Sequence, residues 1–267
     1  MLPHSLRART EFGYAASERM IRSGKEGTVG MDAKPRSSLG ARVTERLRRA
    51  IIDGELELGD ALSEDKLATT LGVSRSPVKE AFATLEQQGL IDVRPQRGSF
   101  VFLPTREDTE NLCEFRKTIE IEAVRLAMSR RRDETLKAMR AAAEDMMAAC
   151  EAGDNHRSAR ADDHFHDASL ENCGNPYLFN AYQLVSSKVA ALRSHRSTLP
   201  TRKNASAEHI AIVELLESNR ITEGLDMLGT HVLMMAVRYG IEEEPLRLPG
   251  GRAARSAKLD HIGLLPD

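Results

Sequence analysis

The amino-acid sequence predicts a mainly α-helical protein with two folded blocks between two polar ends. Aromatic residues make up only 4% of the 267 residues and tryptophan is absent, whereas Ala, Leu, Met, Glu and Arg, which favour helices, are abundant. Apolar residues recur at helical spacing along most of the chain, and one pair of short β-type runs interrupts them. We therefore expect three helices with a hairpin, followed by an antiparallel bundle of six helices.

The charge and the cysteine content limit the class of protein. A formal net charge of −2 disfavours a strongly basic polymer binder, but not a protein that meets nucleic acid with one face. The three cysteines are isolated and odd in number, so we expect reduced thiols that serve packing. No apolar run reaches membrane-spanning length and no signal-peptide core is found, which predicts a soluble, cytoplasmic protein without membrane contact.

Four segments are expected along the chain: 1–38, 39–104, 105–243 and 244–267. The first segment is rich in Arg, Ser and Gly and lacks apolar periodicity, so it is expected to be a disordered arm. Met31 within it is an alternative initiator to Met1. The last segment contains Pro-Gly-Gly-Arg and small or charged residues, which predicts a disordered tail. The two middle segments are the folded blocks.

The first block has the pattern of a winged helix-turn-helix. An amphipathic helix ends near Gly54, and Ser63 caps a second, short helix. A third helix extends from Ser74 to a boundary at Gly89. Two β-type runs follow, joined by the hairpin turn Pro95-Gln96-Arg97-Gly98.

The third helix has the features of a helix that reads DNA. Gly72 suits a tight turn, Ser74 is a good N-cap, and Pro77 falls in the first helical turn. The apolar positions at helical spacing predict a buried stripe of Val78, Ala81, Phe82 and Leu85. The opposite face is then exposed at the end of the helix that enters the major groove in this kind of fold.

The candidate DNA-binding residues are Ser74, Arg75, Ser76, Lys79, Arg97 and Gly98. Arg75 can bond bidentately to guanine O6 and N7, and Lys79 can reach a base edge or a phosphate. The two serines suit phosphate contacts at the helix N-terminus, and the hairpin arginine is placed to enter a minor groove. The alternative is a solvated basic helix, but the turn, the spacing and the hairpin together favour DNA binding.

The second block is helical throughout. One helix is marked by apolar residues from Leu112 to Leu126, and five more are expected around 133–151, 157–172, 176–195, 204–218 and 221–241. Their short connections predict antiparallel neighbours.

Four residues of this block form a candidate metal site. Asp162 and His166 lie one turn apart, the spacing with which a single helix chelates a metal. His209 and His231 each share a face with apolar residues on separate helices and should point into the interior. Such a set would suit Zn²⁺, Ni²⁺ or Mn²⁺, with positions left for water or a ligand. Alternatively, each histidine is a satisfied core residue, and spacing alone leaves both possibilities open.

Several groups of residues in the first block carry a family resemblance: Leu67-Ala68, Gly72-Val73-Ser74-Arg75, Pro77-Val78-Lys79-Glu80-Ala81, Leu85, Gly89-Leu90 and Arg97-Gly98-Ser99-Phe100-Val101. This pattern, over about residues 42–103, resembles the GntR family of bacterial transcription regulators. Lys79 departs from the arginine usual in the family, and a lysine lacks the planar bidentate fork. Asp65 also stands where some relatives carry a DNA-contacting arginine.

The second block carries a related resemblance in Arg116, Glu120, Ala127, Asp162, Phe165-His166, Asn175-Pro176, Leu178, Glu208-His209 and His231. This pattern resembles the ligand-sensing FCD domain of the FadR subgroup of GntR regulators, in its shorter, VanR-like form. The resemblance implies that the aspartate and the three histidines bind a metal that helps to hold an effector carboxylate. Arg116 would be a second anchor for it, with Arg193 as a weaker candidate. A structural pair between Arg116 and Glu120 is the alternative.

These observations lead to three hypotheses of function. The first is a homodimeric regulator, a repressor, that binds a pseudo-palindromic operator and responds to a small carboxylic acid. The second is a metal-dependent hydrolase at the same site, which is disfavoured because four ligands crowd the ion and no acid has a claim to be the general base. The third is a metal that only stabilises the bundle. We therefore expect no enzymatic activity.

Overall fold

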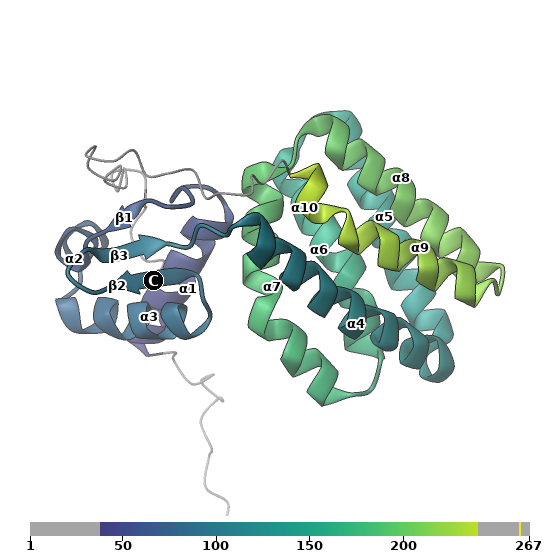
Figure 1. Cartoon of the computed structure of the whole chain (residues 1–267), viewed down its shortest axis with the longest axis horizontal. Helices are drawn as coiled ribbons and strands as arrows, with labels where there is room; N and C mark the ends of the chain where they lie inside the picture. Colours follow the sequence, from purple (N-terminus) through teal and green to yellow (C-terminus); the bar gives the residue numbers. More distant parts are fainter. Residues whose placement is uncertain (1–37, 240–261, 263–267) are drawn as a thin grey trace, which may run out of the picture. The chain divides into compact units, whose positions relative to one another are not determined.

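The computed structural model describes residues 38–239 and residue 262 (Figure 1). The predicted arm and tail, apart from Ser38 and Ile262, lie outside the described residues. Within the described part, none of the helices combines the length and the apolar character needed to cross a bilayer.

The N-terminal part is a helix-turn-helix with a three-stranded wing. Its elements are α1 (Leu39–Ile52), β1 (Ala61–Leu62), α2 (Glu64–Leu71), α3 (Arg75–Gln87), β2 (Ile91–Arg94) and β3 (Gly98–Val101). The strands are antiparallel in the order β1-β3-β2, with Ser99 opposite both Leu62 and Val93. The sequence did not predict β1, because two residues are too few to show the alternation of a strand.

The turn between α2 and α3 is built as the sequence predicts. The Ser63 side chain accepts a hydrogen bond from the Lys66 amide, and Gly72 ends α2 in the left-handed conformation, with φ of 66°. The predicted stripe on α3 is buried. One expectation is corrected: Ser74 is at the N-cap position of α3, but its side chain makes no capping hydrogen bond to the described residues. The first amides of α3 therefore have no acceptor from this serine.

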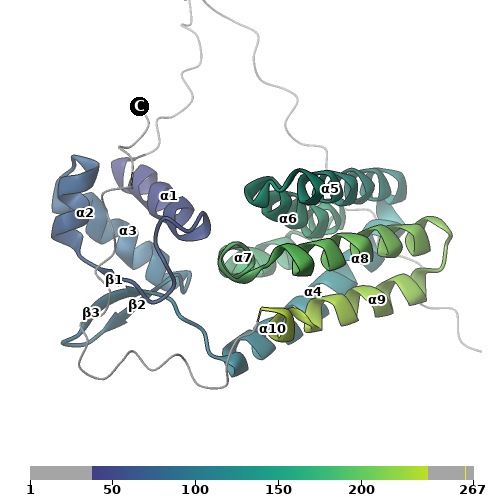
Figure 2. The same ribbon diagram turned by 90° about the horizontal axis from the view of Figure 1, so that it is seen from above.

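The C-terminal part is a bundle of helices. They are α4 (Arg106–Arg130), α5 (Arg132–Ala152), α6 (Asn155–Asn172), α7 (Pro176–Arg196), α8 (Leu199–Glu217), α9 (Ile221–Leu233) and α10 (Met235–Arg238). Helix α5 packs on α6 and α8, and α9 packs on α4 and α8. Figure 2 shows α8 and α9 side by side along the bundle. The mainly helical fold predicted from the sequence is confirmed.

Two helix boundaries differ from the prediction. Helix α8 begins five residues earlier, at Leu199, because the Thr198 side chain caps it and Pro200 fits its first turn. The predicted last helix is interrupted at Met234 and continues as the four-residue α10. The three cysteines are free and buried, as expected for packing residues.

Candidate functional site

The N-terminal end of α3 presents a basic, exposed face. Ser74, Arg75, Ser76 and Lys79 are all exposed there. Lys79 has no ion-pair partner among the described residues. Arg75 is already engaged, since its Nε is 2.8 Å from Asp65 Oδ1 and its Nη2 is 3.7 Å from Glu64 Oε2. The sequence analysis noted Asp65 as unusual but did not predict this contact with Arg75, the arginine that it expects to contact bases.

The wing places a second cation at its tip. Arg97 and Gly98 are exposed in the turn between β2 and β3, and Gly98 has a φ of 101° that favours glycine. Apart from Gly98 itself and its two chain neighbours, none of the described residues has an atom within 4 Å of the position that a Cβ of Gly98 would occupy. Arg94, which the sequence analysis missed, stacks its guanidinium over the Phe100 ring, 4.8 Å from its centroid.

The three predicted histidines meet in the interior of the bundle. His166 comes from α6, His209 from α8 and His231 from α9, and one ring nitrogen from each lies within 4.8 Å of the others. The Nε2 atoms of His209 and His231 are 3.1 Å apart. Asp162 Oδ1 is 3.3 Å from His166 Nε2 and 3.9 Å from His209 Nε2. The four side chains named as candidate metal ligands are thus brought together.

The centre of this cluster contains polar atoms that need a partner. Asp162 Oδ1 and His166 Nε2 are buried, and although they lie 3.3 Å apart, neither makes a hydrogen bond of good geometry to the described residues. An unpartnered buried polar atom costs roughly 1–3 kcal/mol. A divalent cation between these atoms would satisfy them together, so the residues present fit a metal ion.

Two carboxylates fix the rings from behind. Glu120 Oε2 is 2.7 Å from His166 Nδ1, and Glu208 Oε2 is 2.6 Å from His231 Nδ1. A histidine that donates from Nδ1 to a carboxylate presents the lone pair of Nε2 in the opposite direction. His209 is held differently, because its ring stacks on Phe165 with centroids 3.7 Å apart. Each of the three rings is therefore oriented by a neighbour.

The sequence analysis missed the roles of both glutamates. Glu120 was considered only as a partner of Arg116, and Glu208 was named only within the pattern that resembles the FCD domain. Both glutamates belong to the pattern that carries the FCD resemblance, so that pattern was the signal that could have indicated them.

Burial and neighbouring charges shift the pKa values of the aspartate and the three histidines at this site. Burial opposes ionisation of Asp162, but the Arg193 guanidinium and His166 hold the pKa of that carboxyl well below its usual range. Burial would lower the pKa of His166, but the carboxylates of Glu120 and Asp162 together outweigh burial and raise that pKa to about 9. Burial lowers the pKa of His209 and of His231. These two rings are therefore neutral at pH 7 and available as ligands.

Three arginines line a small cavity beside the histidines. The two predicted effector residues, Arg116 and Arg193, are buried there. The third is the partly exposed Arg238 of α10, which the sequence analysis missed. Arg116 Nε donates to Glu120 Oε1 over 2.8 Å, whereas its buried Nη2 has no hydrogen-bond partner in the described structure. The predicted pair with Glu120 thus exists, and it leaves one guanidinium nitrogen unused.

The other two arginines are neutralised by acids. Arg193 Nε is 2.9 Å from Asp162 Oδ2, and its Nη1 pairs with Asp163. Arg238 Nη2 is 2.6 Å from Glu208 Oε1. Glu120, Asp162 and Glu208 therefore each contact both a histidine of the cluster and an arginine of the cavity.

Comparison with known proteins identifies the family. Residues 39–101 match the model of bacterial regulatory proteins of the gntR family, and residues 111–233 match the FCD domain. A transcriptional regulator in the TAR-I ttuE-ttuC' intergenic region of Agrobacterium vitis is 36% identical over 126 residues, which are 45% of this chain and 72% of that protein. The chain belongs to the GntR family.

Other relatives of this GntR protein are also regulators. LutR of Bacillus subtilis is 32% identical over 51% of the chain and 69% of LutR. The repressor RspR of Escherichia coli is 36% identical, and the match covers 38% of the chain and 45% of RspR, about half the length of that relative. These relatives are described as regulators of transcription and not as enzymes, so the hydrolase interpretation has no support.

Solved structures agree with this assignment. A GntR transcriptional regulator from Rhodococcus sp. RHA1 is 25% identical, with a TM-score of 0.65 over 76% of this chain and 98% of that one. E. coli McbR/YncC, at 20% identity, has the same TM-score over 76% of this chain and 98% of that one, and so shares the fold.

Proposed function

We propose that this GntR protein is a cytoplasmic, homodimeric regulator that represses transcription by binding a pseudo-palindromic operator. The proposed domains are residues 39–104 for DNA and 105–243 for the effector. The proposed DNA contacts are Ser74, Arg75, Ser76, Lys79, Arg97 and Gly98. This is supported by the exposure of all six and by their location at the two ends of the motif that meet the major and minor grooves.

We infer further that a divalent ion, Zn²⁺, Ni²⁺ or Mn²⁺, is held by Asp162, His166, His209 and His231. The observation that carries this inference is the convergence of three buried imidazoles beside buried polar atoms that make no hydrogen bond to the described residues. Two nitrogens each about 2.1 Å from one ion lie roughly 3.0–3.4 Å apart, and the two nearest imidazole nitrogens are 3.1 Å apart. The metal and the bundle of six long helices also support placement in the FadR subgroup, in its VanR-like form.

The effector that we propose for this cavity is a small carboxylic acid. Three arginines face four acids there, namely Glu120, Asp162, Asp163 and Glu208. Without a metal, the protonated His166 balances that excess of one acid, so these groups carry no net charge together. A divalent ion that displaces this proton gives them a net charge of +1, which would attract an anion. Arg116 then offers its unused nitrogen to the carboxylate, with Arg193 as the second contact.

The function is tested with DNA taken from upstream of the gene of the protein itself. Fluorescence anisotropy should show specific binding by the metal-loaded protein and release when carboxylic acids handled by neighbouring genes are added. Coupling requires that the acid bind the DNA-free state more tightly than the DNA-bound state. Absence of binding to that DNA, or indifference to each of those acids, would contradict the proposal.

A metal that only stabilises the bundle is the second candidate, favoured by the burial of all four ligands. A structural metal and an effector-binding metal predict different results when the ion is removed. If the metal is only structural, its removal lowers the melting temperature while the acid still releases the protein from DNA.

A further inference from the structure

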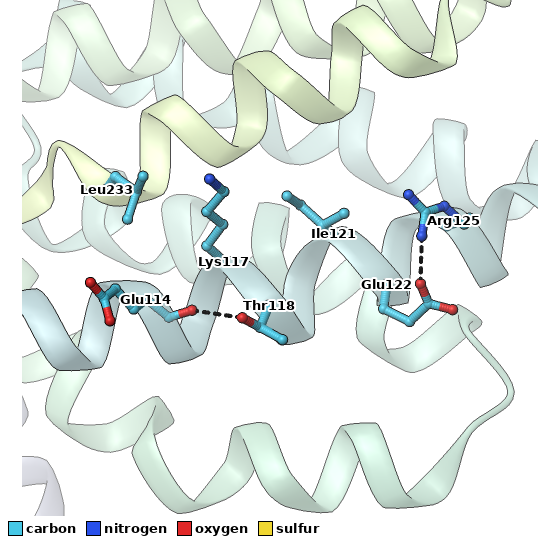
Figure 3. Close-up of a pocket in the computed structure, with 7 residues that line it drawn as sticks. All are labelled: Glu114, Lys117, Thr118, Ile121, Glu122, Arg125 and Leu233. Carbon is cyan, nitrogen blue, oxygen red and sulfur yellow. Dashed lines mark hydrogen bonds and ion pairs between the residues drawn. The ribbon is translucent and has the colours of Figure 1, made fainter.

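A groove on the surface of the bundle lies between α4 and α9, and its lining includes none of the three histidines (Figure 3). Gly229 lets α9 approach α4 closely, because a Cβ on it would lie 3.0 Å from Lys117 Cε and 3.3 Å from Ile121 Cδ1. The groove is lined by Glu114, Lys117, Thr118, Ile121, Glu122, Arg125 and Leu233. Six of these seven residues belong to α4, so one face of that helix forms most of the surface.

The charges on this face have a symmetric arrangement. Along α4 they are Glu114, Lys117, Glu122 and Arg125. The midpoint between Glu114 and Arg125 is the same as the midpoint between Lys117 and Glu122, and it falls between residues 119 and 120. A second α4 helix that ran antiparallel about this midpoint would place each acid opposite a base. A parallel helix in the same register would instead place every charge opposite its own copy.

The charges are available for such a contact. Glu114 is exposed, and neither it nor Lys117 has an ion-pair partner among the described residues. Glu122 and Arg125 pair only with one another along the helix, at 2.8 Å, and their side chains are 43% and 60% exposed. Exposed pairs of this kind contribute little on their own, so they can be exchanged for contacts with another chain.

Apolar side chains occupy the centre and the edge of the same face. About the common midpoint, Thr118 would lie opposite Ile121 of a second copy. Leu233 and Met234 at the end of α9 are each 38% exposed. A face with apolar residues near its centre and complementary charges around them is typical of an interface between subunits.

We propose that the α4–α9 groove is the two-fold interface of the homodimer, with α4 antiparallel to α4 of the second copy. This inference rests on the homodimer proposed above and identifies its surface. An isologous interface must be self-complementary, and the four charges of α4 satisfy that condition in the antiparallel register only. The paired segment from Glu114 to Arg125 is about 18 Å long, at 1.5 Å per residue.

The interface helix also carries part of the effector site. Arg116 and Glu120 lie on the buried face of α4, opposite the groove. Glu120 contacts a histidine of the proposed metal centre. A change in the position of α4 on binding an acid would therefore reach the second copy directly.

Single charge-reversal variants of the full-length chain test the antiparallel register of the two α4 helices. Their dimer dissociation constants are measured by sedimentation equilibrium. Lys117→Glu and Glu122→Lys each place like charges opposite one another in two symmetry-related pairs. Each variant alone should raise the dimer dissociation constant at least tenfold. An equimolar mixture of the two should recover dimerisation to within about threefold of the parent protein, because both pairs in the mixed dimer join opposite charges. Lys137→Glu, at an exposed cation on α5, is the matched control and should leave the constant unchanged.

The possible failures are distinguishable. Circular dichroism establishes that each variant is folded. If the parent protein is a dimer and both variants dimerise as it does, or if their mixture fails to recover, this surface is not the interface, whereas the proposed homodimer stands. If the parent protein is a monomer at concentrations where it binds DNA, the homodimer and this interface are both refuted.

Discussion

Replacing Glu120 distinguishes most clearly between two hypotheses: that the histidines bind a metal, and that they only pack in the core of the bundle. The two carboxylate oxygens of Glu120 contact two different partners, Arg116 Nε at 2.8 Å and His166 Nδ1 at 2.7 Å. Burial would raise its pKa, but the charges and hydrogen bonds of Arg116 and His166 together outweigh burial and lower the pKa of Glu120 to about 2. The residue is therefore ionised at neutral pH. Glu120→Gln preserves the shape of the side chain and removes this charge.

Two effects of Glu120→Gln are expected, and each has a magnitude. Loss of a carboxylate that orients a metal-bound histidine weakens metal binding roughly 10–100-fold. Arg116 is 2% exposed, and leaving such a buried charge unpaired costs about 3–5 kcal/mol. For a chain of this size each kcal/mol lowers the melting temperature by roughly 2–4 °C, so a decrease of about 6–20 °C is expected at constant protein concentration.

The assay combines metal titration with a chromophoric chelator and thermal unfolding of the metal-free protein. Glu208→Gln is the matched comparison, since Glu208 contacts His231 in the same manner but its side chain is 28% exposed. It should weaken metal binding to a similar degree and lower the melting temperature less. Metal affinity equal to that of the parent protein in the Glu120→Gln variant would refute the argument that this carboxylate orients His166.

Three further predictions follow from the same contacts. Asp65→Asn releases Arg75 from its ion pair and should tighten operator binding about two- to fivefold at low salt, an effect that high salt removes; an unchanged affinity would mean that the pair does not compete with DNA. Arg75→Ala should weaken specific binding by about 1–3 kcal/mol and relax the choice of base at one position, as measured by anisotropy on a set of single-base operator variants; equal losses on all of them would assign Arg75 to a phosphate instead. His209→Ala should lose metal binding and the response to acid while operator binding without acid persists, and a full acid response in that variant would favour a purely structural ion.

Local pattern was sufficient to predict the DNA-reading part. The turn at Gly72 and the buried stripe of α3 depend on residues within one or two helical turns, so their spacing can be read directly. The strand β1 could not be predicted, because it pairs with β3 nearly forty residues later and has only two residues. The engagement of Arg75 by Asp65 was missed for a similar reason, since it crosses the turn between two helices.

The candidate metal centre could be predicted in its ligand types but not in its supports. The apolar stripes around His209 and His231 indicated that both rings point inward, and both are buried. The contact between His166 and Glu120 joins residues 46 positions apart, and that between His231 and Glu208 joins residues 23 positions apart. Such pairings depend on how the helices pack, which no spacing within one helix reveals. Arg238 was missed because the break at Met234 and the short α10 carry it into the cavity wall.

The central claim, that three buried histidines hold one divalent ion, is tested most directly by X-ray absorption spectroscopy of the full chain loaded with Zn²⁺, Ni²⁺ or Mn²⁺. We predict one ion per chain with a nitrogen and oxygen shell, the scattering signature of three imidazoles, and for zinc metal–nitrogen distances of about 2.0–2.1 Å. His209→Ala should abolish tight binding of the ion, and with it that signature. A loaded protein with fewer than one tightly bound ion per chain, or an ion surrounded by water oxygens alone, would contradict the account.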